Sequence, residues 1–218
     1  HWLDPTRPFA KAVLEPAHGA VITSATLKDR AVDAAPGTDW RLAELRTGAN
    51  HLVLPPQRFD APSPFDYGRA TRVLIVTDVR PRDTQALAGA YRALIRASGG
   101  GALGLFTAIA RLKAVYARIA APLAGEGLAL HAQHVDPIDA GTLVDMFRFD
   151  AHASLLGTDA LRDGVDVPGE SLRLVVLEGV PWPRPTVLHA ARRLAFGGQV
   201  YDDMVIRARL AQAFGRLI

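Results

Sequence analysis

The sequence predicts an α/β protein in which a mainly parallel sheet lies between layers of helices. Short apolar runs alternate with longer stretches of helical periodicity, which is typical of parallel strands joined by crossover helices. With 218 residues, 49% of them hydrophobic and 22% charged, the chain can bury a substantial core. No apolar run reaches the ~18 residues of a membrane span, and the first residues lack the pattern of a signal peptide. We therefore expect a cytoplasmic protein without a membrane partner.

The elements are expected in a regular order. The expected strands are Ala20–Thr23, Arg72–Val76, Ala102–Phe106, Leu128–Ala132, Ser154–Leu156 and Leu172–Leu177. The expected helices are Thr84–Ala97, Ile109–Ala121, Gly141–Arg148, Thr186–Leu194 and Tyr201–Phe214. Asp83 and Asp139 precede two of these helices, where a carboxylate can accept hydrogen bonds from the first turn. Right-handed crossovers between the strands would give a RecA-like or Rossmann-like layered domain.

Residues 33–62 interrupt this pattern. They are rich in proline and lack sustained periodicity, which predicts a linking segment. One or two short strands are expected inside it, around Arg41–Leu45 and His51–Leu54. Residues 1–32 then belong to a preceding unit, and the main domain covers residues 63–218. A chain that opens at His1 and closes on Ile218 is expected to be part of a longer protein.

Charge and side-chain chemistry narrow the possible functions. The net charge is +3, and only three of the 25 basic residues are lysines. Arginine suits bidentate contact with phosphate, although an arginine-rich chain can equally reflect biased codon composition. The absence of cysteine excludes disulfides, thiolate zinc sites and an iron–sulfur cluster within this stretch. The seven histidines form no HxxxH or HExxH pair, so we expect no metal site here.

Gly157–Gly169 is the most informative loop. It directly follows the expected strand Ser154–Leu156, at the edge where open α/β sheets bind ligands. Its glycines allow close approach of the backbone to another group. Its carboxylates, among them Asp163 and Asp166, could orient an arginine, a ribose hydroxyl or a water. An ordinary turn rich in Gly, Asp and Pro is the alternative.

Two further segments carry polar side chains at suitable places. Ser24 and Thr26 follow an expected strand and could hydrogen-bond a phosphate-binding loop, or simply cap the strand end. Gln212 and Arg216 are four residues apart in the last expected helix, so both could point at one partner. An arginine that reaches phosphates held by another domain is the arginine-finger arrangement. The alternative is a solvated arginine on a surface helix.

Taken together, five segments resemble the helicase motifs of the DinG/XPD branch of superfamily two. They are Thr23–Leu27 (TSATL, third motif), Ser63–Tyr67 (SPFDY, the entry to the second motor domain), Gly99–Thr107 (GGGALGLFT, fourth), Gly157–Gly169 (fifth) and Gln212–Ile218 (sixth). In that family, two RecA-like domains clamp ATP between them and move along single-stranded DNA in the 5′-to-3′ direction. The resemblance implies a RecA-like second motor domain, preceded by the tail of the first.

The resemblance also implies roles for individual residues. Arg216 would be the arginine finger, with Gln212 beside it. The ATP cleft would be lined by the fifth-motif residues Gly164, Asp163 and Asp166. Nucleotide state would be coupled to DNA grip by Ser24, Ala25 and Thr26. DNA phosphates would be contacted by Thr107 and Thr158.

Trp182 and Arg184 lie in a proline-rich loop after the last expected strand. Trp182 could stack on a base and Arg184 could reach a phosphate. The alternative is a rigid loop whose tryptophan packs against the core.

The sequence departs from the family in three places. Leu161-Arg162-Asp163 stands where members usually have Phe-Trp-Glu, and Asp163 has a shorter reach than glutamate. The final arginine of the sixth motif would follow Ile218. No GxxxxGK[ST] loop or DEAH-like box is present. ATP and Mg²⁺ are therefore expected to bind mainly to a first RecA-like domain outside this chain. Because this chain has no cysteine, an iron–sulfur cluster is possible only in that missing part. Alone, this chain is expected to lack ATPase and unwinding activity.

Two other classes of function remain open. A helicase-like module could serve only protein contacts, although such a module has no use for Gln212 and Arg216. A stand-alone Rossmann-like enzyme could use Gly99–Gly101 for phosphate binding. That triple glycine precedes its strand, however, whereas dinucleotide-binding glycines follow theirs.

Overall fold

The computed structural model describes residues 3–29, 38–80, 82–158, 161, 166–167 and 169–217. The chain divides into two compact units. Unit 1 comprises His1–Val73 and Trp182–Arg209, and unit 2 comprises Leu74–Pro181 and Leu210–Ile218.

Unit 2 is built on a four-stranded parallel sheet with the strand order β2-β3-β1-β4. The strands are β1 (Ala102–Phe106), β2 (Leu130–Ala132), β3 (Ser154–Thr158) and β4 (Leu174–Leu177). All four fall within or overlap the strands expected from their apolar runs. Strand β1 is buried along its whole length and lies between β3 and β4, which explains why its sequence is an unbroken small and apolar run.

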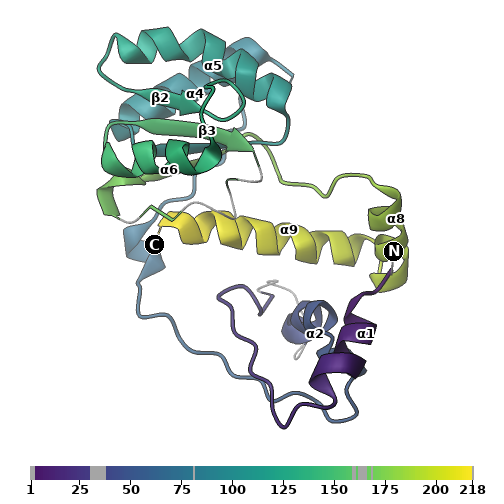
Figure 1. The fold of residues 1–218 in the computed structure, drawn as a ribbon. Coiled ribbons are helices and arrows are strands. Elements are labelled where there is room, and N and C mark those ends of the chain that lie inside the picture. The colour runs from purple at the N-terminus through teal and green to yellow at the C-terminus, as the bar shows by residue number, and fades with distance from the viewer. Residues whose placement is uncertain are drawn as a thin grey trace. The chain divides into compact units, whose positions relative to one another are not determined.

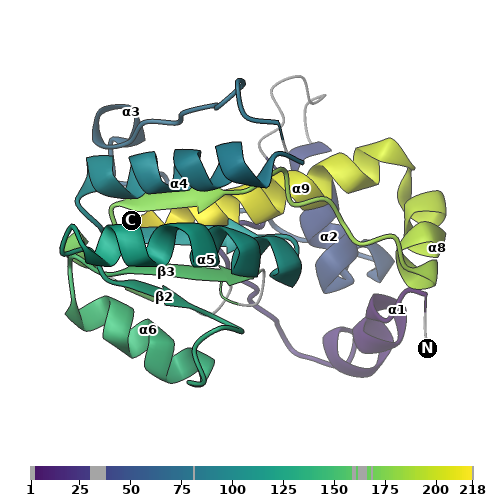
Figure 2. The same ribbon diagram turned by 90° about the horizontal axis from the view of Figure 1, so that it is seen from above.

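Helices cover both faces of this sheet (Figure 1). Helices α4 (Thr84–Ser98) and α5 (Ile109–Ala124) pack side by side on one face, as Figure 2 shows from above. Helix α6 (Ala140–Phe149) lies on the other face. A 3₁₀ turn, Gly169–Ser171, precedes β4. The predicted three-layer α/β class, with its parallel sheet of RecA-like type, is thereby confirmed.

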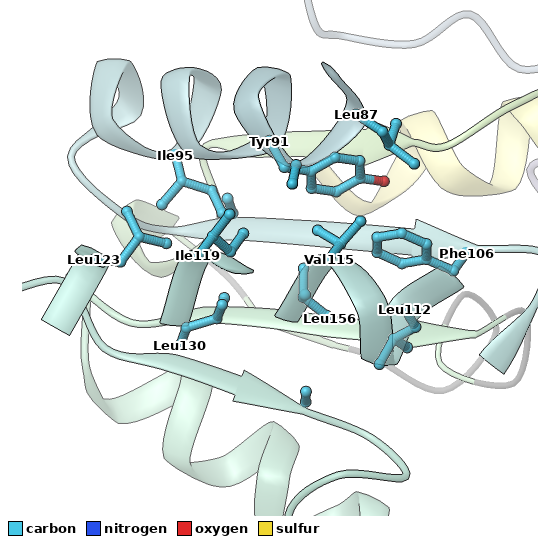
Figure 3. Packing of buried hydrophobic residues seen from close by; sticks show 13 residues of the cluster. Leu87, Tyr91, Ile95, Phe106, Leu112, Val115, Ile119, Leu123, Leu130 and Leu156 are labelled. Atoms are coloured by element: carbon cyan, nitrogen blue, oxygen red, sulfur yellow. The ribbon is translucent and has the colours of Figure 1, made fainter. Parts of the chain in front are cut away.

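Each face of the sheet has its own hydrophobic core. On the α4/α5 face, Tyr91 of α4 stacks on Phe106 of β1 with ring centroids 4.9 Å apart, and Leu112, Val115 and other α5 residues close over them (Figure 3). On the α6 face, Phe147 is fully buried among residues of β1, β3 and the loop after β3. Burial on both sides of the sheet supplies most of the favourable free energy of folding.

The helix starts in unit 2 follow the sequence signals. The Asp83 carboxylate accepts a hydrogen bond from the Ala86 amide at the start of α4, and Asp139 does the same for Thr142 at the start of α6. The pKa of Asp139 is lowered, chiefly by its hydrogen bond from the Thr142 hydroxyl. Both expected caps are confirmed.

Unit 1 is helical. It contains α1 (Thr6–Phe9), a π-helical turn (Ala10–Leu14), a 3₁₀ turn (Thr38–Trp40), α2 (Arg41–Thr47), a second 3₁₀ turn (Ala49–His51), α3 (Tyr67–Ala70) and α8 (Val187–Phe196). Helix α9 (Gln199–Phe214) begins in unit 1 and ends in unit 2, where the 3₁₀ turn Gly215–Leu217 follows it.

Several expected strands are wrong. Arg41–Leu45 and His51–Leu54 were expected to be extended, but Arg41–Thr47 is helix α2 and Ala49–His51 is a 3₁₀ turn. Leu42 and Ala43 are the buried residues of α2. A segment of seven residues is too short for its pattern of apolar residues to distinguish a helix from a strand.

Ala20–Thr23 and Arg72–Val76 are irregular as well. Both are apolar yet exposed, with Val21 at 95% and Ile75 at 83%. A strand needs a neighbour to satisfy its backbone groups, and neither run pairs with another strand in the described part of the chain.

Candidate functional site

The carboxyl ends of the four parallel strands present a row of polar side chains. Gln133 directly follows β2, Thr158 ends β3, Thr107 directly follows β1 and Glu178 directly follows β4. The strand order places them along the edge in that sequence, and Phe106 is the register partner of Thr158. The structure therefore brings the two threonines predicted to contact DNA to adjacent strand ends.

Thr107 is held by a buried carboxylate. Its backbone N–H and its hydroxyl both donate to Glu178 Oε2, at 3.0 and 2.9 Å. The Glu178 side chain is only 2% exposed, and its other oxygen lies 2.5 Å from Nε of Arg111. Arg111 also donates from Nη2 to the Thr107 hydroxyl oxygen at 2.8 Å. Burial raises the pKa of the nearby Tyr91 hydroxyl well above its usual value, and the negative charge of Glu178 raises it further.

Thr158 is held in the same way by a neutral side chain. Its backbone N–H and its hydroxyl both donate to Gln133 Oε1, each at 3.0 Å. The Gln133 backbone N–H in turn donates to the Leu156 carbonyl at 2.9 Å. Each threonine is thus fixed by one acceptor from the neighbouring strand end.

The fifth-motif loop is described in part. Leu161 and Val167 are each 4% exposed and pack into the core on the α6 face. Asp166, which lies between Leu161 and Val167 in the chain, is exposed. Arg148 of α6 donates from Nε and Nη2 to the Asp166 carbonyl at 3.1 and 2.7 Å. Asp163 and Gly164 lie outside the described residues. Their predicted place in an ATP cleft stays a prediction, as does that of Asp166.

The sixth-motif segment is anchored by two apolar side chains. Ala213 is 1% exposed and Leu217 packs against the same core on the α6 face. Gln212 and Arg216 are half-buried beside these anchors. Helix α9 ends at Phe214 and Arg216 lies in a 3₁₀ turn. The spacing of the two residues suggested that they lie in one α-helix. They do not, because the chain tightens into a 3₁₀ turn after Phe214.

Ser24, Ala25 and Thr26 form a turn in unit 1 rather than the end of a strand. The Thr26 backbone N–H donates to the Ser24 hydroxyl at 3.2 Å, and the two hydroxyls lie 3.3 Å apart. Ser24 and Ala25 are exposed. The hydroxyl groups hold the local turn together.

Trp182 and Arg184 are both exposed, Trp182 at 55%. The alternative in which the tryptophan packs into the core is therefore wrong. An exposed indole flanked by prolines is available for stacking.

The triple glycine has a structural explanation. Gly99, Gly100 and Gly101 all have positive φ and turn the chain from α4 into the amino end of β1. A Cβ on Gly100 would lie 2.2 Å from the His152 carbonyl oxygen. The Arg173 guanidinium packs on Gly101 and donates to the Gly99 carbonyl at 2.9 Å. The turn lies at the end of the strand opposite to the one where α/β sheets bind nucleotides, which disfavours a Rossmann-like phosphate site.

Four residues of this region were missed by the sequence reasoning, namely Arg111, Gln133, Arg148 and Glu178. Gln133 and Glu178 could have been found, because each is the first polar residue after a buried strand. Arg111 and Arg148 carry no comparable signal, since each is one of many arginines on helices.

Among the described residues, no helix has the length and apolarity to span a membrane, and no three His, Cys, Asp or Glu side chains gather closely enough to bind a metal ion.

Comparison with known proteins agrees with this arrangement. The family described as "Helicase C-terminal domain" matches residues 91–218. The "ATP-dependent helicase DinG" of Mycobacterium tuberculosis H37Rv is 32% identical over 231 residues, which cover 98% of this chain and 31% of that protein. The "ATP-dependent DNA helicase YoaA" of Escherichia coli K12 is 29% identical over 169 residues, 72% of this chain and 26% of that protein.

A third relative has a different name. The "3'-5' exonuclease DinG" of Bacillus subtilis 168 is 28% identical over 198 residues, 87% of this chain and 20% of that protein. The chain thus spans less than a third of the length of these relatives. The family match over more than half of the chain, together with these relatives, shows that this chain belongs to the family of DinG-like helicase C-terminal domains.

Proposed function

We propose that this chain is the second motor domain of an ATP-dependent 5′-to-3′ DNA helicase. The observation that supports this most strongly is the register of β1 and β3, in which Phe106 pairs with Thr158. Because of that register, the strands of the fourth and fifth motifs end together at the edge where α/β sheets bind ligands.

The complete protein would contain a first RecA-like domain. Residues 1–32 would be the tail of that domain, residues 33–62 the link, and residues 63–218 the second motor domain. ATP and Mg²⁺ would bind mainly to the first domain, because this sequence has neither a GxxxxGK[ST] loop nor a DEAH-like box. An iron–sulfur cluster would also have to lie there, since this chain has no cysteine.

Arg216 would act as the arginine finger, with Gln212 beside it. The buried Ala213 and the partly buried Leu217 hold the turn that carries Arg216 against the core, and a cation held in place can stabilise charge on the transferring phosphoryl group. Asp166, Asp163 and Gly164 would line the same cleft.

The turn of Ser24, Ala25 and Thr26 would pass changes at the nucleotide to the DNA-binding surface. The DNA track would include the strand ends at Thr107 and Thr158, with Trp182 stacking on a base and Arg184 near a phosphate. Contacts of this kind follow the backbone of a single strand and weaken as salt rises.

The arginine finger is tested by ATP hydrolysis in the full-length protein that carries this chain. We expect Arg216→Ala to lower DNA-stimulated kcat by about a thousandfold or more while ATP binding is largely kept. Arg118→Ala is the control, because Arg118 is exposed and its guanidinium donates to the Ala114 carbonyl in its own helix. If both variants hydrolysed ATP equally well, the finger would be assigned wrongly.

The division of labour between the domains has a separate test. The isolated chain should show neither ATPase nor unwinding activity. ATP hydrolysis by the purified chain that disappeared in Arg216→Ala would show that it carries a complete ATP site.

A further inference from the structure

Thr107, the threonine of the fourth-motif segment, has both of its hydrogen-bond donors occupied in this structure. Its N–H and its hydroxyl both point at Glu178 Oε2. A phosphate oxygen in a DNA backbone only accepts hydrogen bonds, so it needs a donor. Since the Glu178 side chain is buried to 2% exposure and joined to Arg111, it cannot leave Thr107 without breaking an ion pair.

Arg111 differs from Thr107 in this respect. Its guanidinium has five N–H groups, and the structure shows Nε at Glu178 and Nη2 at the Thr107 hydroxyl oxygen. The side chain is 37% exposed. Arg111 therefore combines a fixed orientation with an accessible cationic edge, at the carboxyl end of β1.

The neighbouring strand ends show why Glu178 is charged. Gln133 fixes Thr158 through the same two hydrogen bonds and is neutral. An amide is thus sufficient to hold a threonine at this edge. The negative charge of Glu178 matches the additional partner at that position, the guanidinium of Arg111.

We propose that Arg111 contacts a backbone phosphate of single-stranded DNA at the carboxyl edge of the sheet, and that Glu178 is the positioning residue that orients it. Thr107 acts through Arg111, as part of the same hydrogen-bonded group. The proposal rests on the DNA-binding function proposed above and specifies which side chain meets the phosphate.

The substitution Glu178→Gln distinguishes positioning from simple charge. It makes the protein more positive by one charge, which by itself strengthens binding to DNA. However, a glutamine whose oxygen accepts from Thr107 puts its NH₂ group, which is a donor, in the place of the carboxylate oxygen beside Arg111, so the ion pair is lost. Arg111 then loses its orientation. Glu178→Gln is therefore expected to weaken DNA binding despite the added charge.

The experiment measures binding of a labelled oligothymidylate to the full-length protein by fluorescence anisotropy, at several KCl concentrations and without nucleotide. Arg111→Ala should weaken binding by about three- to tenfold and lower the slope of log Kd against log salt by about 0.7. Glu178→Gln should weaken it in the same direction, and Arg111→Ala/Glu178→Gln should be no weaker than Arg111→Ala alone. Arg118→Ala, which removes the same charge from the exposed face of α5, should change binding less than twofold.

The outcomes separate the two proposals. If the wild type does not bind oligothymidylate, the DNA-binding function itself fails, and this inference fails with it. If the wild type binds and Arg111→Ala equals Arg118→Ala, only the inference is overturned. It is also overturned if Glu178→Gln binds more tightly than the wild type, or if Thr107→Val still lowers the affinity when Arg111 is already alanine. Because the Arg111 variants alter a partly exposed side chain, they remain informative even if Glu178→Gln folds poorly.

Discussion

Asp29 and Arg207 form a two-pronged ion pair in unit 1 although 178 residues separate them in the sequence. Arg207 Nε lies 2.7 Å from Asp29 Oδ1, and Nη2 lies 2.6 Å from Oδ2. The Asp29 side chain is 6% exposed. Its hydrogen bonds raise the pKa of Arg207 above the ordinary value. The pair ties the chain just after the Ser24–Thr26 turn to helix α9.

Asp29→Asn should destabilise unit 1 by about 1–2 kcal/mol. Breaking a fully buried pair costs more, but solvent screens Arg207, whose side chain is 35% exposed. Urea unfolding followed by tryptophan fluorescence would measure the change. Glu44→Gln breaks the more exposed pair with Arg58 in the same unit and should cost under about 1 kcal/mol. Equal effects of the two substitutions would show that burial of Asp29 adds nothing.

Two glycines of unit 2 should respond oppositely to alanine. A Cβ on Gly104 in β1 would lie 2.6 Å from Leu156 Cδ2 and 2.8 Å from Tyr91 Cε1, so Gly104→Ala overpacks the core and should cost about 1–3 kcal/mol. A Cβ on Gly89 in α4 would meet nothing within 4 Å, so Gly89→Ala should stabilise the helix by about 0.5–1 kcal/mol. Thermal unfolding of both variants measures the signs. A destabilised Gly89→Ala would contradict the open space seen beside it.

Gln133→Ala should destabilise unit 2 by about 1–2 kcal/mol. The substitution leaves the N–H and hydroxyl of Thr158 without their acceptor, and unsatisfied donors at a part-buried position carry that cost. Gln133→Glu keeps an acceptor oxygen and should recover most of the stability at neutral pH. Urea midpoints of the three proteins provide the measurement. If glutamate were as destabilising as alanine, the hydrogen bonds to Thr158 would not be the cause.

The stabilising contribution of Glu126 to unit 2 should be lost in acid, when its carboxylate is protonated. Its pKa lies below the usual 4.5, mainly because Arg92 donates a hydrogen bond to it, with added attraction from Arg96. A carboxyl group whose folded pKa is lowered contributes stability above its unfolded pKa and loses it as the pH falls through the folded value. Glu126→Gln should therefore be less stable than the wild type at pH 7, and the difference should vanish well below pH 4.5. A difference in urea midpoint that stayed constant with pH would contradict this.

The core of unit 2 could be predicted closely from the sequence. Strand β1 has the predicted bounds, and helices α4, α5 and α6 differ from the predicted ranges by a few residues at most. These segments have strong periodicity and flanking caps or glycines, so local sequence and tertiary packing favour the same conformation. Unit 1 was predicted less well, because short segments such as α2 give too few residues to separate one period from another.

The candidate site was likewise predictable from the sequence only in part. The order of the motifs, the lack of a phosphate-binding loop and the pairing of Thr107 and Thr158 with strand ends were all present in the sequence. The partners of those threonines were not. Glu178 is 71 residues from Thr107 in the chain, and Gln133 is 25 residues from Thr158.

By itself, the sequence determined the layered α/β class, the strand ends that carry polar groups, and the helicase family. Alternation of apolar and helical segments and short ordered motifs are local properties, so they can be read along the chain. Only the tertiary structure decided that Glu178 occupies both donors of Thr107, that Arg111 stands beside it, and that α9 gives way to a tighter turn before Arg216. Hydrogen bonds and ion pairs act over a few ångströms in space, and the order in which β2, β3, β1 and β4 assemble determines which distant side chains come within that range.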